Sequence, residues 1–387
     1  MPAGSWGQFG EPWSVIDPGR EANCGREFTK VLGAWNGVLW DGRYVWQWAG
    51  GGHGDGCNNG LMRYDLATGR PEWVVPHMAL NVPLCRIYVD GNGRRDCFNE
   101  PYVSARPWPA GMDLTKEEKL AKGPVIDDVF AIEEKFGAFL RPRSSHMYNN
   151  MVRIGDWVYL IVGDIWGSGK TDFQVWRYNA AVQDIAASIE RVADNYDPRA
   201  AGGRGDVIVG GRGNANWVEP PGRMPFALTG SGRCTPIDLE KGRWHCESYP
   251  GMTTNGTRAA LWDATRNGVW LLRPRVRQLA FYAENGLGQL IENPSLSVTS
   301  PELSDAGGLC LVPTDAGADP VMLQSDGDLV RWNGTELDIV SLPGAPKTES
   351  RRTYNKWIWD NAVGACLGTF TTNEAIWIYK PDVSSGQ

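Results

Sequence analysis

Apolar residues along this chain come in short runs, and Asp, Asn and Gly separate one run from the next. The segments 268–272 and 320–323 are typical, with five and four residues respectively. Runs of this length favour β-strands, because a helix needs a longer segment with apolar residues repeating about every 3.6 positions. The pattern therefore predicts an all-β chain of short strands joined by tight turns.

One strand pattern recurs along the chain. It begins with an aromatic residue followed by Asn, continues as an apolar strand and ends in an Asp or Gly turn. Clear copies begin at Trp35, Tyr148 and Tyr354, and weaker copies begin near Asn216, Thr257 and Gly308. Six starts at steps of roughly 40 residues, apart from one gap, indicate radial repetition. We therefore expect one β-propeller domain over residues 1–387, with about six four-stranded blades and a seventh if the gap hides one.

The gap covers residues 76–142. It contains a pair of Cys residues and a stretch whose apolar side chains are spaced as in a helix, from Val125 to Leu140. We expect a partly helical insertion that forms a loop or lid beside the central channel and is not a separate domain. At the start of the chain, the region from Trp6 to Val15 is expected to add a strand to the last blade, because ring closure removes exposed sheet edges.

Composition narrows the classes of partner. The chain has 19 Trp, 48 Gly, 21% charged residues and a net charge of −7, and acidic chains seldom bind nucleic acid. No apolar run approaches the roughly 18 residues of a membrane helix. We expect a monomer that binds neither nucleic acid nor membrane. Local Arg residues still allow an anionic sugar as substrate.

Eight Cys residues are present, and two pairs share one spacing: Cys85 with Cys97, and Cys234 with Cys246. The second pair brackets a strand, a turn and a strand, and cysteines across such a hairpin can come within bonding distance. Disulfides are favoured over buried free thiols, although the connectivity stays open. Disulfides persist in oxidising compartments, so a secreted or periplasmic protein is expected.

The first repeat also resembles a Kelch repeat. Its strand at 45–52 ends in glycines, and Tyr64 and Trp73 follow on the next two strands. More narrowly, the segment GGGHGD at 50–55, followed by RSSHMY at 143–148, is similar to bacterial galactose-oxidase-like Kelch propellers. The resemblance implies a propeller over most of the chain. It implies no single activity, because much of that group has none established.

Polar residues from distant segments are expected to meet at one mouth of the channel. In a propeller, the starts of the first strands and the loops between second and third strands lie on the same face. The candidates are His53, Asp55, Asn58, Arg143, His146, Tyr148, Asn214, Asn216, Arg258, Arg352 and Tyr354. Structural alternatives stay open for them, including a turn role for Asp55 and contacts between blades for the Arg residues.

Such a set contains the groups that β-elimination of a uronate-containing glycan needs. His146 or His53 would be the base, Tyr148 the acid, and Arg258 or Arg352 the partner of the substrate carboxylate. Tyr354 joins this catalytic group, and Asp55, Asn58, Arg143, Asn214 and Asn216 would bind substrate. Several propeller polysaccharide lyases resemble this layout. The first hypothesis is thus a polysaccharide lyase acting on a polysaccharide or oligosaccharide.

Three other functions stay open. They are a propeller that binds a glycan or a protein without chemistry, a glycosidase and a metal-dependent oxidase. Lyase chemistry of this kind requires no cofactor, and Asp90, Asn92 and Asp96 space oxygen donors as a structural Ca²⁺ loop would. That segment lacks the distal bidentate acid. His53, His146 and Asp55 are an alternative set of ligands for a transition metal.

Overall fold

A computed structural model gives the structure of this chain. It describes residues 1–17, 19, 28, 32, 37–48, 60–75, 85–89, 95–99, 151–161, 175–193, 216–229, 232–238, 243–248, 257, 259–304, 307–314, 317–347 and 356–382.

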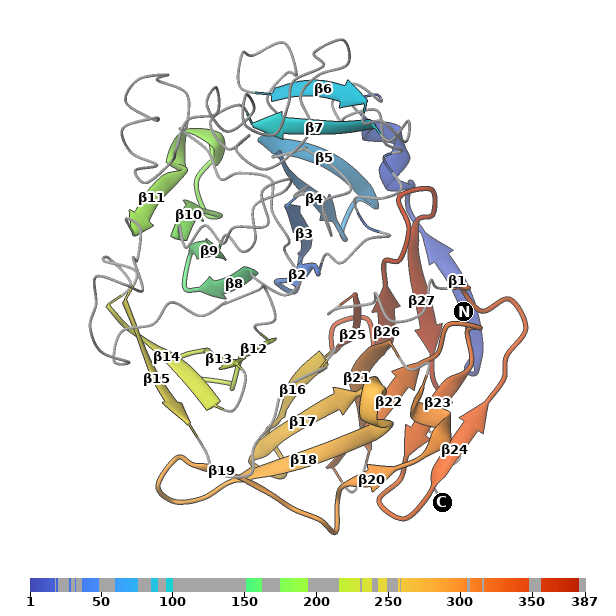
Figure 1. Ribbon diagram of the computed structural model, residues 1–387. Coiled ribbons are helices and arrows are strands. Elements are labelled where there is room, and N and C mark those ends of the chain that lie inside the picture. Colours follow the sequence, from blue (N-terminus) through green and yellow to red (C-terminus); the bar gives the residue numbers. More distant parts are fainter. Residues whose placement is uncertain are drawn as a thin grey trace.

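The described strands pair into six antiparallel sheets of four or five strands, arranged around a common centre, and one separate two-stranded sheet (Figure 1). Sheet 1 holds β2 (Leu39–Trp40), β3 (Tyr44–Trp48), β4 (Leu61–Asp65) and β5 (Arg70–Val75). Sheet 2 holds β8 (Met151–Ile154), β9 (Trp157–Ile161), β10 (Val175–Asn179) and β11 (Glu190–Ala193). Sheet 3 holds β12 (Asn216–Val218), β13 (Phe226–Thr229), β14 (Gly232–Asp238) and β15 (Arg243–Ser248).

The second half of the chain continues in the same way. Sheet 4 holds β16 (Ala259–Asp263), β17 (Gly268–Arg273), β18 (Gln278–Glu284), β19 (Leu290–Glu292) and the short β20 (Val298–Thr299). Sheet 5 holds β21 (Gly308–Thr314), β22 (Gly317–Leu323), β23 (Leu329–Trp332) and β24 (Leu337–Val340). Sheet 6 holds β25 (Trp357–Asp360), β26 (Ala365–Gly368), β27 (Ile376–Lys380) and β1 (Ser5–Phe9). The prediction of an all-β propeller is confirmed.

The first strand of each sheet lies innermost. Strands β12 and β16, β16 and β21, β21 and β25, and β2 and β8 are neighbours across sheet boundaries. The repeat starts found in the sequence fall at these strands: Asn216 and Gly308 open β12 and β21, and Thr257 comes two residues before β16. The repeated pattern therefore marks the strands that surround the axis.

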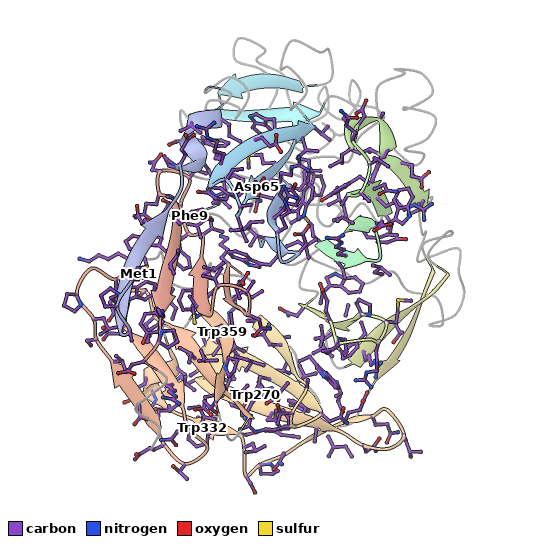
Figure 2. All side chains as sticks on the ribbon, turned by 180° about the vertical axis from the view of Figure 1, so that it is seen from behind. Met1, Phe9, Asp65, Trp270, Trp332 and Trp359 are labelled. Atoms are coloured by element: carbon purple, nitrogen blue, oxygen red, sulfur yellow. The ribbon has the colours of Figure 1, made fainter. Side chains whose placement is uncertain are left out.

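Strand β17 explains why the apolar runs are continuous. All six of its residues are buried, and successive side chains point to opposite faces of the sheet. Val269 and Leu271 pack against sheet 3, whereas Trp270 and Leu272 pack against sheet 5. Figure 2 shows Trp270 and Trp332 in the apolar layer between sheets 4 and 5. A sheet covered on both faces has no polar side, so its strands lose the usual alternation.

The amino-terminal strand closes the ring, as predicted. β1 pairs antiparallel with β27, from Ser5 opposite Lys380 to Phe9 opposite Ile376. Trp6 packs its ring against Trp357, Trp377 and Tyr379 of the same sheet. The strand ends at Phe9, short of the predicted Val15. The 3₁₀ helix η1 (Trp13–Ile16) follows, because Pro12 cannot donate to a further strand pair.

The two hairpins with equally spaced cysteines differ in register. On β14 and β15 Cys234 stands directly opposite Cys246. The hairpin β6 (Cys85–Val89) and β7 (Arg95–Asn99), in the predicted insertion, instead sets Cys97 opposite Ile87. Cys85 and Cys97 are thus diagonal neighbours, a less favourable position for a disulfide than direct opposition. The predicted helical stretch 125–140 lies outside the described residues.

The described part of the chain contains no helix that is both long and apolar enough to span a bilayer.

Candidate functional site at the centre of the ring

A cavity of about 220 Å³ lies among the innermost strands. Five of the six sheets contribute to its wall through β2, β8, β12, β16 and β25 or the residues beside them. The lining residues are Val38, Leu39, Trp40, Met151, Trp217, Glu219, Ala260, Leu261, Trp262, Trp357 and Ile358. The cavity is therefore a product of the whole ring, and no single repeat could form it.

Four tryptophans dominate this wall. Trp217 and Trp357 are buried, whereas Trp40 and Trp262 are partly exposed. Trp40 ends β2, and Trp262 stands one residue before the end of β16. The indole nitrogen of Trp357 has no hydrogen-bond acceptor among the described residues. Aromatic walls of this kind offer flat apolar faces together with a few N–H donors.

Glu219 is the only acidic residue in the lining set. It follows β12 and precedes two prolines, Pro220 and Pro221, which favour an extended backbone at this point. Glu219 is an exposed residue where it borders the cavity, and the cavity itself is partly open, although protein is packed closely around the carboxyl. Desolvation by this surrounding protein raises the pKa of the Glu219 carboxyl to about 7, and the charge of Arg153 partly opposes the rise.

A partly buried ion pair fixes Arg153. Its Nη1 lies 2.9 Å from Oδ2 of Asp41, whose side chain is 1% exposed. Asp41 also accepts the indole N–H of Trp46 at 2.6 Å and the backbone N–H of Tyr44 at 2.6 Å. The Arg153 guanidinium, which belongs to sheet 2, is therefore held by the turn between β2 and β3 of sheet 1. Its positive charge favours the ionised form of Glu219 in sheet 3 without replacing the pairing with Asp41.

Most of the predicted site residues lie outside the described residues. These are His53, Asp55, Asn58, Asp90, Asn92, Arg143, His146, Tyr148, Asn214, Arg258, Arg352 and Tyr354. Asn216 is described: it opens β12, is 3% exposed and directly precedes Trp217 of the cavity wall. Asp96 lies within β7, opposite Tyr88. No group of three or more metal-ligating side chains occurs in the part of the chain that the structure describes.

The sequence pattern did not single out Glu219 or the tryptophans of the wall. A Trp-Asp pair ends the first strands of sheets 1, 4 and 6, at Trp40, Trp262 and Trp359. The repeated Trp-Asp pair could therefore have pointed to two residues of the cavity wall, Trp40 and Trp262. Glu219 has no such signal, because its environment depends on strands from five sheets.

This arrangement suits proton transfer to or from a small ligand. A carboxyl with a pKa near 7 is present in both protonation states at neutral pH, which is the condition for efficient general acid or base catalysis. Its aromatic surroundings would pack against apolar faces of a ligand. Pockets for drug-sized ligands measure about 300–1,000 Å³, so this smaller cavity suits a group of about one sugar ring.

A scan against protein-family models and a search of the curated proteins find no match for this chain. Among solved structures, it is similar to the periplasmic gluconolactonase PpgL of Pseudomonas aeruginosa, with 13% identity, a TM-score of 0.39 and coverage of 87% of this chain and 91% of that one. It is also similar to the β-propeller domain of Cps50 (Swd1) from Myceliophteria thermophila, with 10% identity, a TM-score of 0.41 and coverage of 89% and 96%.

A third similar structure is the extracellular domain of a protein from B. thetaiotaomicron described as a one-component system. The identity is 13% and the TM-score 0.41, and the match covers 89% of this chain but 32% of that one. All three likenesses are distant. The propeller assignment therefore rests on the strand pairing of this chain, and the activities of those proteins are not transferred to it.

Proposed function

We propose that this protein is a carbohydrate-active enzyme that binds one sugar ring in the central cavity. The observation that carries the proposal is Glu219, an acidic residue with a pKa of about 7, in a cavity walled by four tryptophans. The cavity volume of about 220 Å³ matches a single ring. A larger oligosaccharide would extend out of the cavity from that ring.

The reaction that we propose is β-elimination on a uronate residue. Ionised Glu219 takes the proton from the carbon next to the substrate carboxylate. The electron pair of that C–H bond forms a C=C bond as the C–O bond to the neighbouring sugar breaks. Tyr148 gives the leaving oxygen its proton, and Arg258 or Arg352 neutralises the carboxylate. His146 and His53 are further candidates for the base, and the reaction needs no cofactor.

In this proposal the protein acts outside the cytoplasm, on polysaccharide or oligosaccharide. Glycans with uronate residues are large, and a secreted or periplasmic enzyme can reach them. The predicted disulfides would persist in the same oxidising compartments.

The test replaces Glu219 by Gln, which keeps the shape and removes the ionisable group. Wild type is incubated with a panel of uronate polysaccharides, and the ultraviolet absorbance of the unsaturated product is followed. We expect Glu219→Gln to reduce kcat/KM by about 10²- to 10⁴-fold. Glu336→Gln is the matched control, because Glu336 is exposed in the turn between β23 and β24 of sheet 5, and sheet 5 contributes no residue to the cavity wall.

The pH profile separates a base from a structural residue. Because the base must be ionised, kcat/KM of wild type should rise as the pH passes through about 7, the pKa of Glu219. Residual activity of Glu219→Gln should lack this step. If wild type binds the glycans but never yields an unsaturated product, the lyase proposal is wrong and a binding propeller replaces it.

A further inference from the structure

Two cysteines from different sheets lie side by side in the apolar core. Cys310 is in β21 of sheet 5 and Cys366 is in β26 of sheet 6. Both are completely buried, and their sulfur atoms are 3.3 Å apart. They are 56 residues apart in the sequence, so no hairpin brings them together. Only the packing of one sheet on the next places them in contact.

The surroundings of this pair are apolar. Val312, Val321, Leu323 and Phe370 belong to the same cluster. Burial raises the pKa of the Cys366 thiol well above its ordinary value, and its contact with Cys310 adds to the rise. These thiols are therefore poor nucleophiles and poor metal ligands in the folded protein. The described residues also provide no third ligand beside them.

We propose that Cys310 and Cys366 form a disulfide that joins sheet 5 to sheet 6. The sulfur atoms must approach by about 1.2 Å to reach the normal S–S length of about 2.05 Å. Each thiol loses a proton, and the pair loses two electrons to a disulfide-bearing oxidant. That oxidant is reduced to two thiols by thiol–disulfide exchange.

Burial sets the time at which the bond can form. A large oxidant cannot reach two sulfur atoms with no exposed surface. Exchange must therefore take place before sheets 5 and 6 have packed fully together. The finished bond is then enclosed by the core and resists reduction as long as the sheets stay packed.

The decisive experiment maps the bond in the wild-type chain. The full chain is refolded in oxidised and reduced glutathione, unfolded with an alkylating agent present, and digested with trypsin. The peptides 278–331 and 357–387 contain one cysteine each, Cys310 and Cys366. We expect them as one linked species that is lighter than the sum of the two by two hydrogen atoms. The same digest tests Cys234 and Cys246 as a second linked pair.

Two alkylated, separate peptides would overturn the proposal, and so would a link from either cysteine to a different one. A stability measurement adds a second readout. Oxidised wild type should unfold several degrees above the reduced form, because the cross-link restricts the unfolded chain. In the double variant Cys310→Ala, Cys366→Ala the difference should shrink to what the remaining disulfides contribute. If that variant does not fold, the peptide map still decides.

Discussion

At the residue scale, a buried aspartate ends the first strand of two sheets and organises the turn behind it. Asp41 and Asp263 each have a side chain that is 1% exposed. Asp41 accepts the indole N–H of Trp46, and Asp263 accepts that of Trp270. Both tryptophans lie on the second strand of the same sheet. The Asp side chain therefore locks the first strand to the second at the edge of the ring.

Removing the Asp263 carboxylate should be costly. It accepts the backbone N–H groups of Thr265 and Arg266, a guanidinium N–H of Arg266 at 2.7 Å and the Trp270 indole at 3.1 Å. Asp263→Ala leaves the buried Trp270 indole without this acceptor and removes three further bonds that hold the turn, and we expect the free energy of unfolding to fall by about 3 kcal/mol. Urea denaturation measures the change.

Asp360 supplies the matched control for this prediction. It occupies the same position in sheet 6 but is partly exposed, and it accepts the backbone N–H groups of Ala362 and Val363. Asp360→Ala should cost about 1 kcal/mol. Equal losses in the two variants would mean that the buried indole and guanidinium bonds contribute nothing.

The Trp-Asp pair is visible in the sequence, and so the strand ends could be predicted from it. Glu219 could not. A glutamate before two prolines has the signature of an exposed loop, and its pKa depends on protein contributed by distant strands. Long-range packing of this kind leaves no local pattern.

At the element scale, the chain passes from β1 of sheet 6 to sheet 1 through a close backbone contact. Gly10 has φ of +81°, and its neighbours across the junction are Gly69 and Tyr64. The Tyr64 hydroxyl donates to the carbonyl of Phe9 at 2.8 Å, and the backbone N–H of Glu11 donates to that of Gly69 at 2.7 Å. Figure 2 shows Phe9 and Asp65 on the two sides of this junction.

Gly10→Ala tests how tightly the junction is packed. An added Cβ would overlap the Tyr64 hydroxyl and the backbone of Gly69, and the positive φ adds its own strain. We expect a loss of about 3 kcal/mol in the free energy of unfolding. Gly4 has a similar φ of +69°, and an added Cβ there would meet nothing within 4 Å. Gly4→Ala should therefore lower the free energy of unfolding by only about 1 kcal/mol. Similar losses at both positions would contradict close packing at the junction.

The register of strand pairing in the two hairpins with cysteines could not be predicted from the sequence. The two cysteine pairs have equal spacing, yet only Cys234 and Cys246 stand opposite each other. A shift in register between Pro236 and Asp238 lies between that pair and the turn. Proline favours such an irregularity because it lacks the N–H that a regular ladder needs. Spacing alone cannot reveal an extra residue in one strand.

At the scale of the whole molecule, the periodic pattern sufficed to predict the architecture. The expected strand starts open or directly precede the innermost strands, and the amino-terminal strand completes the last sheet. The expectation of one polar mouth stays a prediction. Ten of its eleven residues, and two of the three proposed Ca²⁺ ligands, lie outside the described residues. The cavity wall that the structure does describe is aromatic, with Glu219 as its acidic member.

Ring closure by β1 predicts the effect of removing it. A chain lacking residues 1–9 loses five residue pairs with β27 and the aromatic contacts of Trp6. We expect the free energy of unfolding to fall by about 4 kcal/mol. The exposed edge of β27 should also promote self-association, which light scattering would detect.

Rescue in trans provides the control. A synthetic peptide of residues 1–10 should restore the melting temperature of the shortened chain by adding a strand to its edge, and the same peptide with Trp6→Ala should restore much less. A shortened chain as stable as the full one would show that β1 does not close the ring.

The pairing of β1 with β27 also has a consequence for biosynthesis. Sheets 1 to 5 consist of strands that follow one another, so each can form soon after it leaves the ribosome. Sheet 6 needs β1, which precedes the other five sheets in the sequence, and β25, β26 and β27, which follow them. Ser5–Phe9 must therefore wait, with an unpaired edge, until β27 has been translated. During that wait the nascent chain is a natural client for a chaperone that covers exposed strands, and a message cut short before β27 yields a ring that never closes.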